Sequence, residues 1–101
     1  MIKVTCGIIY NDNKIFIARR KEGKSNAGKW EFPGGKLEPG ETEQECLQRE
    51  LKEELGMDIE IIERVGNNIH HYRGFSINLI AFKCIFISAT YKLTDHDNYK
   101  W

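Results

Sequence analysis

Blocks of apolar residues near the start of the chain alternate with polar, glycine-containing segments. Residues 3–10 and 14–19 are rich in β-branched and other apolar side chains, which predicts two strands, and the turn-forming residues 11–13 between them predict a hairpin. Residues 20–30 are polar and basic, so we expect a loop there. The proline and two glycines of residues 33–35 predict unusual backbone geometry at the end of this loop.

Apolar blocks return in the second half of the chain. Residues 58–65 and 68–73 are each typical of a strand, and residues 76–87 are apolar on both faces, which favours a central strand covered from two sides. Residues 91–101 are polar and turn-like. Strands combined with one helix predict an α/β or α+β sandwich, and the pattern leaves the order of strands in the sheet open.

One central segment carries strong helix signals. Thr42 followed by Glu45 is a capping-box pattern, and Gly56 stands where a helix commonly ends. A leucine at every fourth position from 47 to 55 predicts one apolar stripe along the helix. The stripe is the expected contact between the helix and the sheet.

Three carboxylates lie beside this stripe. At about 100° per residue, Glu54 projects about 20° from Leu47, Glu50 about 60° and Glu53 about 120°. Because the three glutamates are spaced three and four residues apart, they are neighbours and repel one another. A divalent cation would relieve that repulsion, and Mg²⁺ prefers such hard oxygen ligands together with the phosphates of a substrate.

The simpler alternative is a solvated acidic face with an ion-pair ladder from Glu45 through Arg49 to Glu53. The spacing of these residues suits such a ladder. However, the carboxylates adjoin the apolar stripe instead of opposing it, which favours the metal site.

Composition narrows the class of protein. The chain has 101 residues with 15 basic and 15 acidic side chains, so residues 1–101 are expected to form one small domain without affinity for long nucleic acid. No signal peptide and no apolar run of about 20 residues is visible, so we expect no membrane association. Cys6, Cys46 and Cys84 form no CxxC pair, which predicts no zinc site and a reduced, cytoplasmic setting.

The segment from Gly35 to Met57 resembles the Nudix box, G-x5-E-x7-R-E-U-x-E-E-x-G-U with U an apolar residue, and matches it at every fixed position. Residues 30–34 before it resemble the MutT branch, whose members hydrolyse nucleoside triphosphates, including oxidised dGTP. The resemblance covers essentially the whole chain. It implies an α/β/α sandwich around a mixed β-sheet, with Mg²⁺ or Mn²⁺ as cofactor and attack of water on a bridging phosphorus.

The resemblance also implies roles for residues of the box. The implied metal ligands are three acidic side chains of the helix and one backbone carbonyl: Glu50, Glu53, Glu54 and Gly34. Glu50 would also orient or deprotonate the attacking water, although the general base among the carboxylates stays open. Arg49 would hold a catalytic carboxylate in place, and Glu53 would be catalytic together with Glu50 and Arg49. Glu41 would support the ligands from outside.

Further residues are expected at the substrate. Arg20 resembles an arginine that contacts substrate phosphate, and its alternative role is part of a solvated basic loop. Glu31 and Phe32 would border the base pocket, although a core position is the simpler interpretation of Phe32. Asp95 resembles a loop glutamate that reaches the metal or the water. Aspartate is one methylene shorter, and Asp97 is its competitor.

Residues 95–101 resemble the approach to a further strand and a C-terminal helix, which we expect this chain to lack. In MutT-like relatives that region carries an asparagine that recognises the base. Reduced stability or formation of a homodimer would then follow. Phe75 stands near a position where some relatives specific for oxidised guanine carry an arginine, and it cannot supply that charge.

These features predict a Mg²⁺-dependent pyrophosphohydrolase that converts a (d)NTP and water to a (d)NMP and pyrophosphate. Removal of 8-oxo-dGTP is the most specific form of this prediction, and a CTP- or dCTP-directed enzyme is the close alternative. A hydrolase of ADP-ribose or a nucleotide sugar, and a non-catalytic nucleotide-binding module, are further alternatives. The presence of every box glutamate argues against the last.

Overall fold

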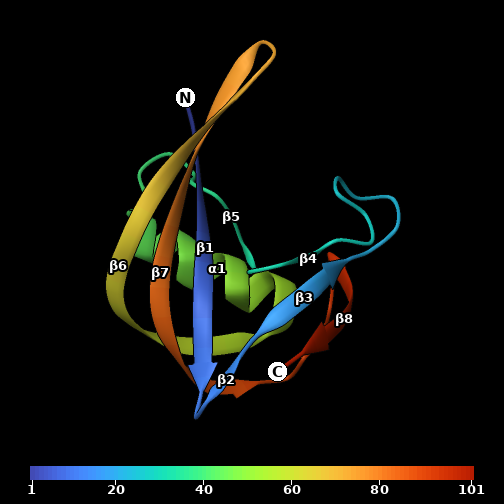
Figure 1. Ribbon diagram of the computed structural model, residues 1–101. Coiled ribbons are helices and arrows are strands. Elements are labelled where there is room, and N and C mark those ends of the chain that lie inside the picture. The colour runs from blue at the N-terminus through green and yellow to red at the C-terminus, as the bar shows by residue number, and fades with distance from the viewer.

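The structure, a computed structural model, describes all 101 residues and contains one helix and eight strands. Figure 1 shows their arrangement. In chain order the elements are β1 (Ile2–Asn11), β2 (Lys14–Ile15), β3 (Ile17–Arg20), β4 (Trp30–Glu31), β5 (Gly34–Lys36), α1 (Glu43–Leu55), β6 (Met57–Tyr72), β7 (Phe75–Ala89) and β8 (His96–Lys100).

The strands form two sheets. The larger sheet has the order β2-β1-β7-β6, with β5 paired to β1 from outside this path. Strands β1 and β7 are parallel and the other pairs are antiparallel, so the larger sheet is mixed. The smaller sheet has the order β4-β3-β8 and is antiparallel. This combination of a mixed sheet and a helix confirms the predicted α/β class.

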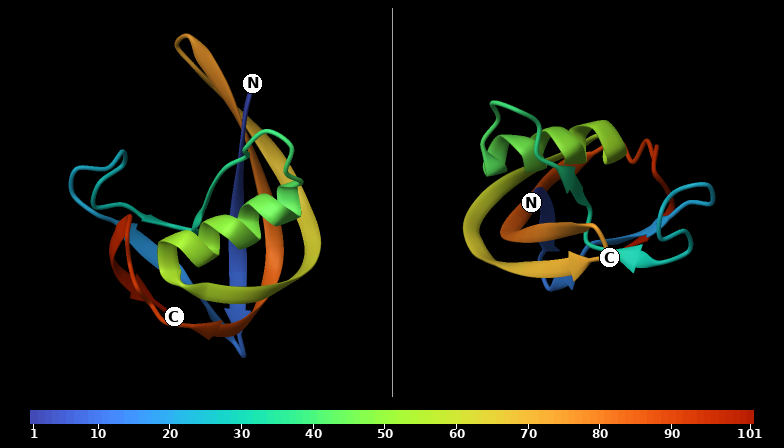
Figure 2. Two further views of the ribbon diagram at one scale, coloured as in Figure 1. Left: turned by 180° about the vertical axis from the view of Figure 1, so that it is seen from behind. Right: turned by 90° about the horizontal axis from the view of Figure 1, so that it is seen from above.

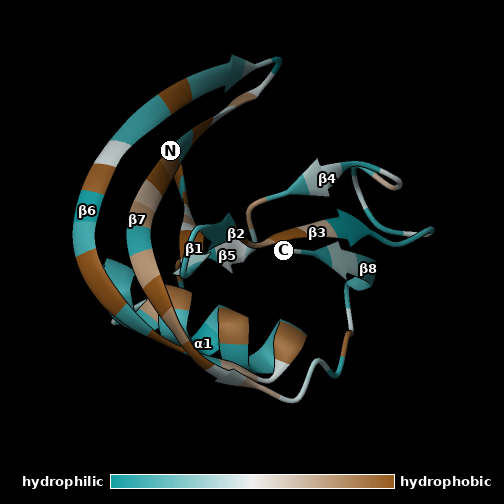
Figure 3. Cartoon of the chain, turned by 60° about the horizontal axis from the view of Figure 1, so that its bottom comes forward, coloured by the Kyte–Doolittle hydropathy of each residue, from teal (hydrophilic) through white to brown (hydrophobic).

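Helix α1 crosses one face of the larger sheet, and the smaller sheet stands beside the end of the helix (Figures 1 and 2). Hydrophobic and hydrophilic segments alternate along α1 (Figure 3), as expected for a helix with one buried stripe. The core joins α1 to both sheets through Ile9, Phe16, Ala18, Leu47, Leu51, Leu55, Met57, Ile59, Ile80, Phe82 and Cys84. No helix of the structure has the length and apolar character needed to cross a bilayer.

The predicted strands of the first hairpin are present, with a break. β1 and β2 pair through Tyr10–Ile15 and Asn11–Lys14, which confirms the predicted turn. The second predicted strand divides at Phe16 into β2 and β3, because this fully buried side chain lies where the chain leaves one sheet for the other.

The second half of the chain departs from the predicted strand pattern in two places. Residues 58–65 and 68–72 are strand as predicted, but the break between them is wrong. They form one strand, β6, because β7 pairs with it along its whole length through three register shifts. The turn-like tail is also wrong over residues 96–100, which form β8 against β3. The polar residues of the tail favoured a turn, but its aromatic side chains pack against the core, and this packing holds the segment as a strand.

The aromatic residues of the tail hold β8 in place. The rings of Tyr91 and Tyr99 stack with centroids 4.4 Å apart. Trp101 packs edge-on against Phe16 and Phe86 at 5.1 and 5.0 Å, and its Nε1 donates to the Tyr91 hydroxyl at 3.0 Å. These contacts place the loop before β8, residues 90–95, against the C-terminal end of α1, where Thr94 N donates to the Glu54 carbonyl.

Candidate active site

Helix α1 begins and ends where its sequence signals predict. The Glu45 N–H donates to Thr42 Oγ1 at 3.1 Å, and the Thr42 N–H donates to Glu45 Oε1 at 2.8 Å, so the capping box is complete. Gly56 has a left-handed φ of 58° and closes the helix. Between these caps, Glu54 is buried together with the leucines, as its predicted angle to the stripe requires.

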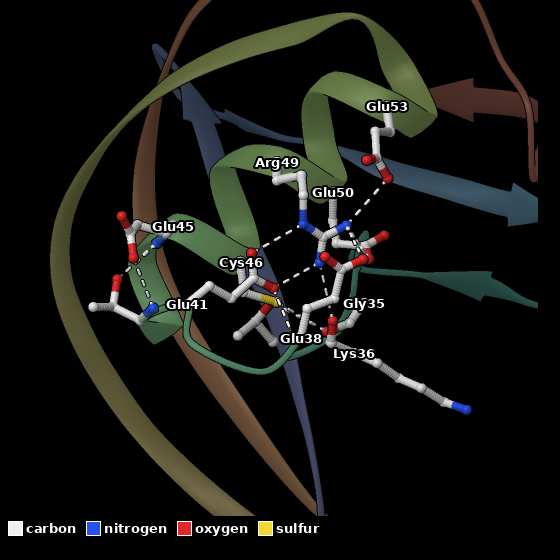
Figure 4. A network of polar contacts seen from close by, with 11 residues as sticks. Gly35, Lys36, Glu38, Glu41, Glu45, Cys46, Arg49, Glu50 and Glu53 are labelled. Carbon is white, nitrogen blue, oxygen red and sulfur yellow. Dashed lines mark hydrogen bonds and ion pairs between the residues drawn. The ribbon is translucent and has the colours of Figure 1, made fainter.

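Arg49 is the centre of a network of carboxylates (Figure 4). Its Nε and Nη2 donate to the two oxygens of Glu41 at 3.0 and 2.7 Å. Its Nη1 donates to Glu50 Oε1 at 3.0 Å and to Glu53 Oε2 at 3.1 Å. Hydrogen bonding to Glu41 is the main cause that raises the pKa of Arg49, and hydrogen bonding to Arg49 is the main cause that lowers the pKa of Glu41 to about 2. The guanidinium therefore fixes two expected ligands from one side.

The alternative ladder from Glu45 through Arg49 to Glu53 is only half present. Arg49 and Glu53 form the predicted ion pair across one helical turn. Glu45 instead caps the helix through Thr42, and Glu41 takes its place beside Arg49.

The two glycines of β5 allow the strand to lie between β1 and α1. A Cβ on Gly34 would meet the Thr5 carbonyl oxygen at 1.9 Å, so Gly34 lies directly against β1. A Cβ on Gly35 would meet Glu50 Cδ at 2.3 Å, so the carboxyl of Glu50 rests on the glycine backbone. Side-chain contacts to the Gly35 carbonyl from Thr5 Oγ1 at 3.3 Å and Cys46 Sγ at 3.5 Å steady this crossing.

Glu54 is the most unusual carboxyl group of the site. It is 5% exposed, and its Oε2 has no hydrogen-bond partner. Burial, the neighbouring carboxyl of Asp95 and the charge of Glu50 raise its pKa to about 9. Burial also raises the pKa of Glu50, against the effect of Arg49. The carboxyl groups of Glu54, Asp95 and Glu50 therefore face one another here, and their proximity disfavours the charged form of Glu54.

The structure distinguishes the two candidate aspartates. The carboxyl of Asp95 lies beside Glu54 and forms an ion pair with Lys24 at 3.2 Å. Burial raises its pKa, but contacts with Glu54 and Lys24 lower it more, and the net direction is downward. Asp97 points elsewhere and pairs with Arg19 at 2.7 Å. Asp95 is therefore the aspartate at the acidic cluster.

The acidic cluster suits a hard cation, although no three His, Cys, Asp or Glu side chains converge into a finished metal site. Its donors are all oxygen atoms, which Mg²⁺ prefers. The partnerless Oε2 of buried Glu54 and the raised pKa of Glu50 both indicate a group that a cation would stabilise in its charged form. The donor set therefore fits Mg²⁺ or Mn²⁺.

A cavity of about 390 Å³ opens beside the cluster. Arg20, Glu31, Phe32, Gly34 and Gly35 all line it, so the structure brings together the expected phosphate contact, base-pocket residues and β5. Phe32 is 42% exposed, so its interpretation as a core side chain is wrong. A larger hollow of about 580 Å³ lies between α1 and β6 and contains none of the expected site residues.

Arg20 and Glu31 have defined partners in the smaller sheet. Arg20 Nε donates to the Ser25 carbonyl at 3.2 Å, and its Nη1 lies 3.7 Å from Glu31 Oε2. The same oxygen lies 2.8 Å from Nε2 of His96, a buried residue that the sequence pattern did not single out. The burial of His96 was not predictable from the local sequence, because its neighbours, Asp95 and Asp97, are polar.

Other residues considered from the sequence lie away from this site. His70 and His71 are exposed on β6, and His71 contacts Ser76 at 2.8 Å. Phe75 is half exposed at the start of β7 and stacks on Tyr72 at 5.0 Å. All three cysteines are buried and free of disulfides.

The fold and the site together define a class of protein. A mixed sheet, the glycine-containing strand β5 and a capped helix bring arginine-bound carboxylates beside a cavity that Arg20 and Lys36 line. This arrangement is typical of an enzyme of phosphate chemistry that uses a metal ion. The chain matches the NUDIX domain over residues 2–99. It therefore belongs to the Nudix family and to its MutT-like hydrolases, as the resemblance of the box predicts.

Individual relatives agree with this assignment. The chain is 38% identical over 101 residues to a CTP pyrophosphohydrolase of Escherichia coli, covering 100% of this chain and 75% of the relative. It is 38% identical over 82 residues to an 8-oxo-dGTP diphosphatase of Proteus vulgaris, covering 80% and 73%. The crystal structure of a MutT protein from Methanosarcina mazei superimposes with a TM-score of 0.88 at 31% identity, covering 99% and 75% of the two chains.

Proposed function

We propose that this protein is a Mg²⁺-dependent nucleoside triphosphate pyrophosphohydrolase. The reaction converts a (d)NTP and water to a (d)NMP and pyrophosphate. The observation that carries the proposal is the placement of the acidic cluster around Arg49 and Glu54 beside a cavity lined by Arg20. The names of the relatives support a nucleotide as substrate.

The cation would be held by carboxylates of α1 together with the backbone of β5: Glu50, Glu53, Glu54 and the Gly34 carbonyl. When bound, such a cation neutralises phosphate charge and lowers the pKa of coordinated water. Arg49 keeps Glu50 and Glu53 oriented through Nη1, and Glu41 supports Arg49 from behind with two hydrogen bonds.

Protein side chains supply the remaining steps. Glu50 accepts a proton from the attacking water, whose oxygen forms a bond to a bridging phosphorus as the bond to the leaving pyrophosphate breaks. Asp95, beside Glu54, orients the same water. Arg20 binds phosphate oxygens with the guanidinium nitrogens that Ser25 does not occupy, while Glu31 and Phe32 contact the base.

Substrate choice follows from the relatives. An 8-oxo-dGTP substrate and a CTP or dCTP substrate are both proposed, because relatives with these names match the chain at the same identity. A nucleotide sugar or ADP-ribose is the second candidate, and it would give two monophosphate products. Three free cysteines support a reducing compartment such as the cytoplasm.

The test measures pyrophosphate release from canonical and oxidised (d)NTPs with Mg²⁺, with Mn²⁺ and with EDTA. Release that requires metal and prefers one nucleotide is expected. Glu50→Gln should abolish it, whereas Glu60→Gln, the same exchange at an exposed residue of β6, should not. The absence of release from every nucleotide by folded protein, or full activity of Glu50→Gln, would contradict the proposal.

A further inference from the structure

The side chain of His96 is completely buried, with 0% of it exposed. Its Nε2 lies 2.8 Å from Glu31 Oε2. Because an ionised carboxylate can only accept, Nε2 is the donor. The other ring nitrogen, Nδ1, has no partner, so Glu31 receives the single polar contact of the buried ring. An imidazole buried in this way contributes one specific polar interaction, and that interaction is with a residue of the cavity.

The smaller sheet enforces this contact. In its registers, Arg20 of β3 pairs with His96 of β8, and Ala18 of β3 pairs with Glu31 of β4. Arg20 and His96 consequently approach the same carboxylate oxygen, Oε2, at 3.7 and 2.8 Å. The second oxygen, Oε1, makes no hydrogen bond or ion pair within the protein.

We propose that His96 is a positioning residue for base recognition. By binding Oε2 of Glu31, it leaves Oε1 free to accept a hydrogen bond from an exocyclic amino group of the nucleobase in the cavity. Apolar side chains that line the same cavity, among them Val4, Phe32 and Leu79, provide the surface for the rings of the base. The inference rests on the proposed function, since it assumes that the cavity takes a nucleotide.

The chemistry of the carboxylate predicts the class of base. An ionised carboxylate accepts hydrogen bonds and donates none, so an amino group matches it and a carbonyl in the same place repels it. Cytosine carries an amino group where uracil carries a carbonyl, and guanine carries an amino group that hypoxanthine lacks. CTP against UTP and dGTP against dITP are therefore matched pairs for the test.

Two substitutions at one position separate positioning from packing. His96→Leu keeps an apolar side chain in the buried site and removes the donor. His96→Gln restores an N–H donor at a similar reach. The parent should favour the amino-bearing nucleotide in at least one pair by kcat/KM. His96→Leu should lower that preference about tenfold, the size of effect of one misplaced hydrogen bond to a charged group, mainly through KM, and His96→Gln should restore it.

A purely structural role predicts something else. In that case His96→Leu would lower kcat/KM equally for both members of each pair, in step with its Tm, and the inference would be overturned. A parent without preference in either pair would overturn it as well. In a Glu31→Ala background, adding His96→Leu should change the preference no further, because both residues act through one contact. An additive loss would contradict the inference.

Equilibrium binding separates this inference from the proposed reaction. Calorimetry with CMP against UMP and GMP against IMP needs no turnover. If pyrophosphate is not released but His96→Leu still reduces the binding preference about tenfold, the proposed reaction fails and the role of His96 stands. If release is normal and the preference is unchanged by His96→Leu, the role of His96 fails alone. A protein that binds none of these nucleotides overturns both.

Discussion

The two neighbouring glycines of β5 provide a sharp test of the site. A Cβ on Gly35 would lie 2.3 Å from Glu50 Cδ, and ordinary contact begins at 3.4 Å, so Gly35→Ala requires the carboxyl to withdraw by about 1.1 Å (3.4 − 2.3). The atoms that must move are the far end of a flexible side chain. A misplacement of about 1 Å at a reacting group costs about 100-fold in rate, so we expect kcat for pyrophosphate release to fall by that factor.

The stability of Gly35→Ala should change little. Overpacking lowers the free energy of unfolding by about 1 kcal/mol. The smaller conformational freedom of alanine in the unfolded chain raises it by about 0.4–1 kcal/mol, so the two effects nearly cancel. The Tm should therefore stay within about 5 °C of the parent. Calorimetric binding of Mn²⁺ should weaken together with kcat, because Glu50 is a proposed ligand. Thermal unfolding, Mn²⁺ titration and initial rates on one preparation complete the assay.

Gly34→Ala is the matched control. Its Cβ would meet the Thr5 carbonyl oxygen at 1.9 Å, and backbone in the middle of a sheet cannot withdraw as a side chain does. We expect a loss of about 3 kcal/mol of stability and a Tm lower by at least about 12 °C. A Gly35→Ala variant that unfolds as readily as Gly34→Ala, or that keeps parental activity and Mn²⁺ affinity, would refute the placement of Glu50 on this strand.

Four further predictions concern Arg49, the two aspartates, Trp101 and the β6–β7 hairpin. Arg49→Lys should lower kcat about 100-fold, because lysine cannot form the paired hydrogen bonds that Arg49 donates to Glu41. Urea unfolding should show a stability change under about 1 kcal/mol, because these ion pairs are partly exposed. Asp95→Asn should lower kcat at least about tenfold, because Asp95 lies at the acidic cluster. Asp97→Asn should leave kcat within about twofold of the parent, because Asp97 pairs with Arg19 instead. Equal effects of the two substitutions on kcat would contradict this. Trp101→Ala should cost about 2 kcal/mol in urea unfolding through its lost aromatic contacts. The exposed apolar residues of the β6–β7 hairpin should drive self-association, and sedimentation as a monomer at every concentration would contradict it.

The helix and the positions of its carboxylates were predictable because they depend on local geometry. Capping by Thr42 and Glu45 and termination at Gly56 follow from interactions within a few residues. The burial of Glu54 follows from its angle to the leucine stripe. The helical wheel places Glu54 nearest to this stripe among the three glutamates, and Glu54 is the one that the fold buries.

The side of the site that we propose to face the base was less predictable, because it depends on contacts between residues far apart in the sequence. His96 and Glu31 are 65 residues apart in sequence, and a polar tail gives no sign that its histidine is buried. The same reason explains the missed strand β8, which is held by aromatic contacts to Phe16. For Phe32 the sequence left a core position and the wall of the base pocket as alternatives, because hydrophobicity does not distinguish a core from an apolar cavity wall.

The difference between local contacts around α1 and long-range contacts in the smaller sheet has a physical consequence for nucleotide specificity. The groups proposed to hold the metal come from one helix, α1, and from the strand beside it, β5, so their geometry is set by local backbone and by Arg49. Two groups proposed for base recognition, Glu31 and His96, come from β4 and β8 of the smaller sheet, and β8 is kept there by the packing of Tyr99 and Trp101. Loosening β8 should therefore change nucleotide preference before it changes metal binding. A change in β8 that weakened Mn²⁺ binding first would show that the two halves of the site are mechanically coupled.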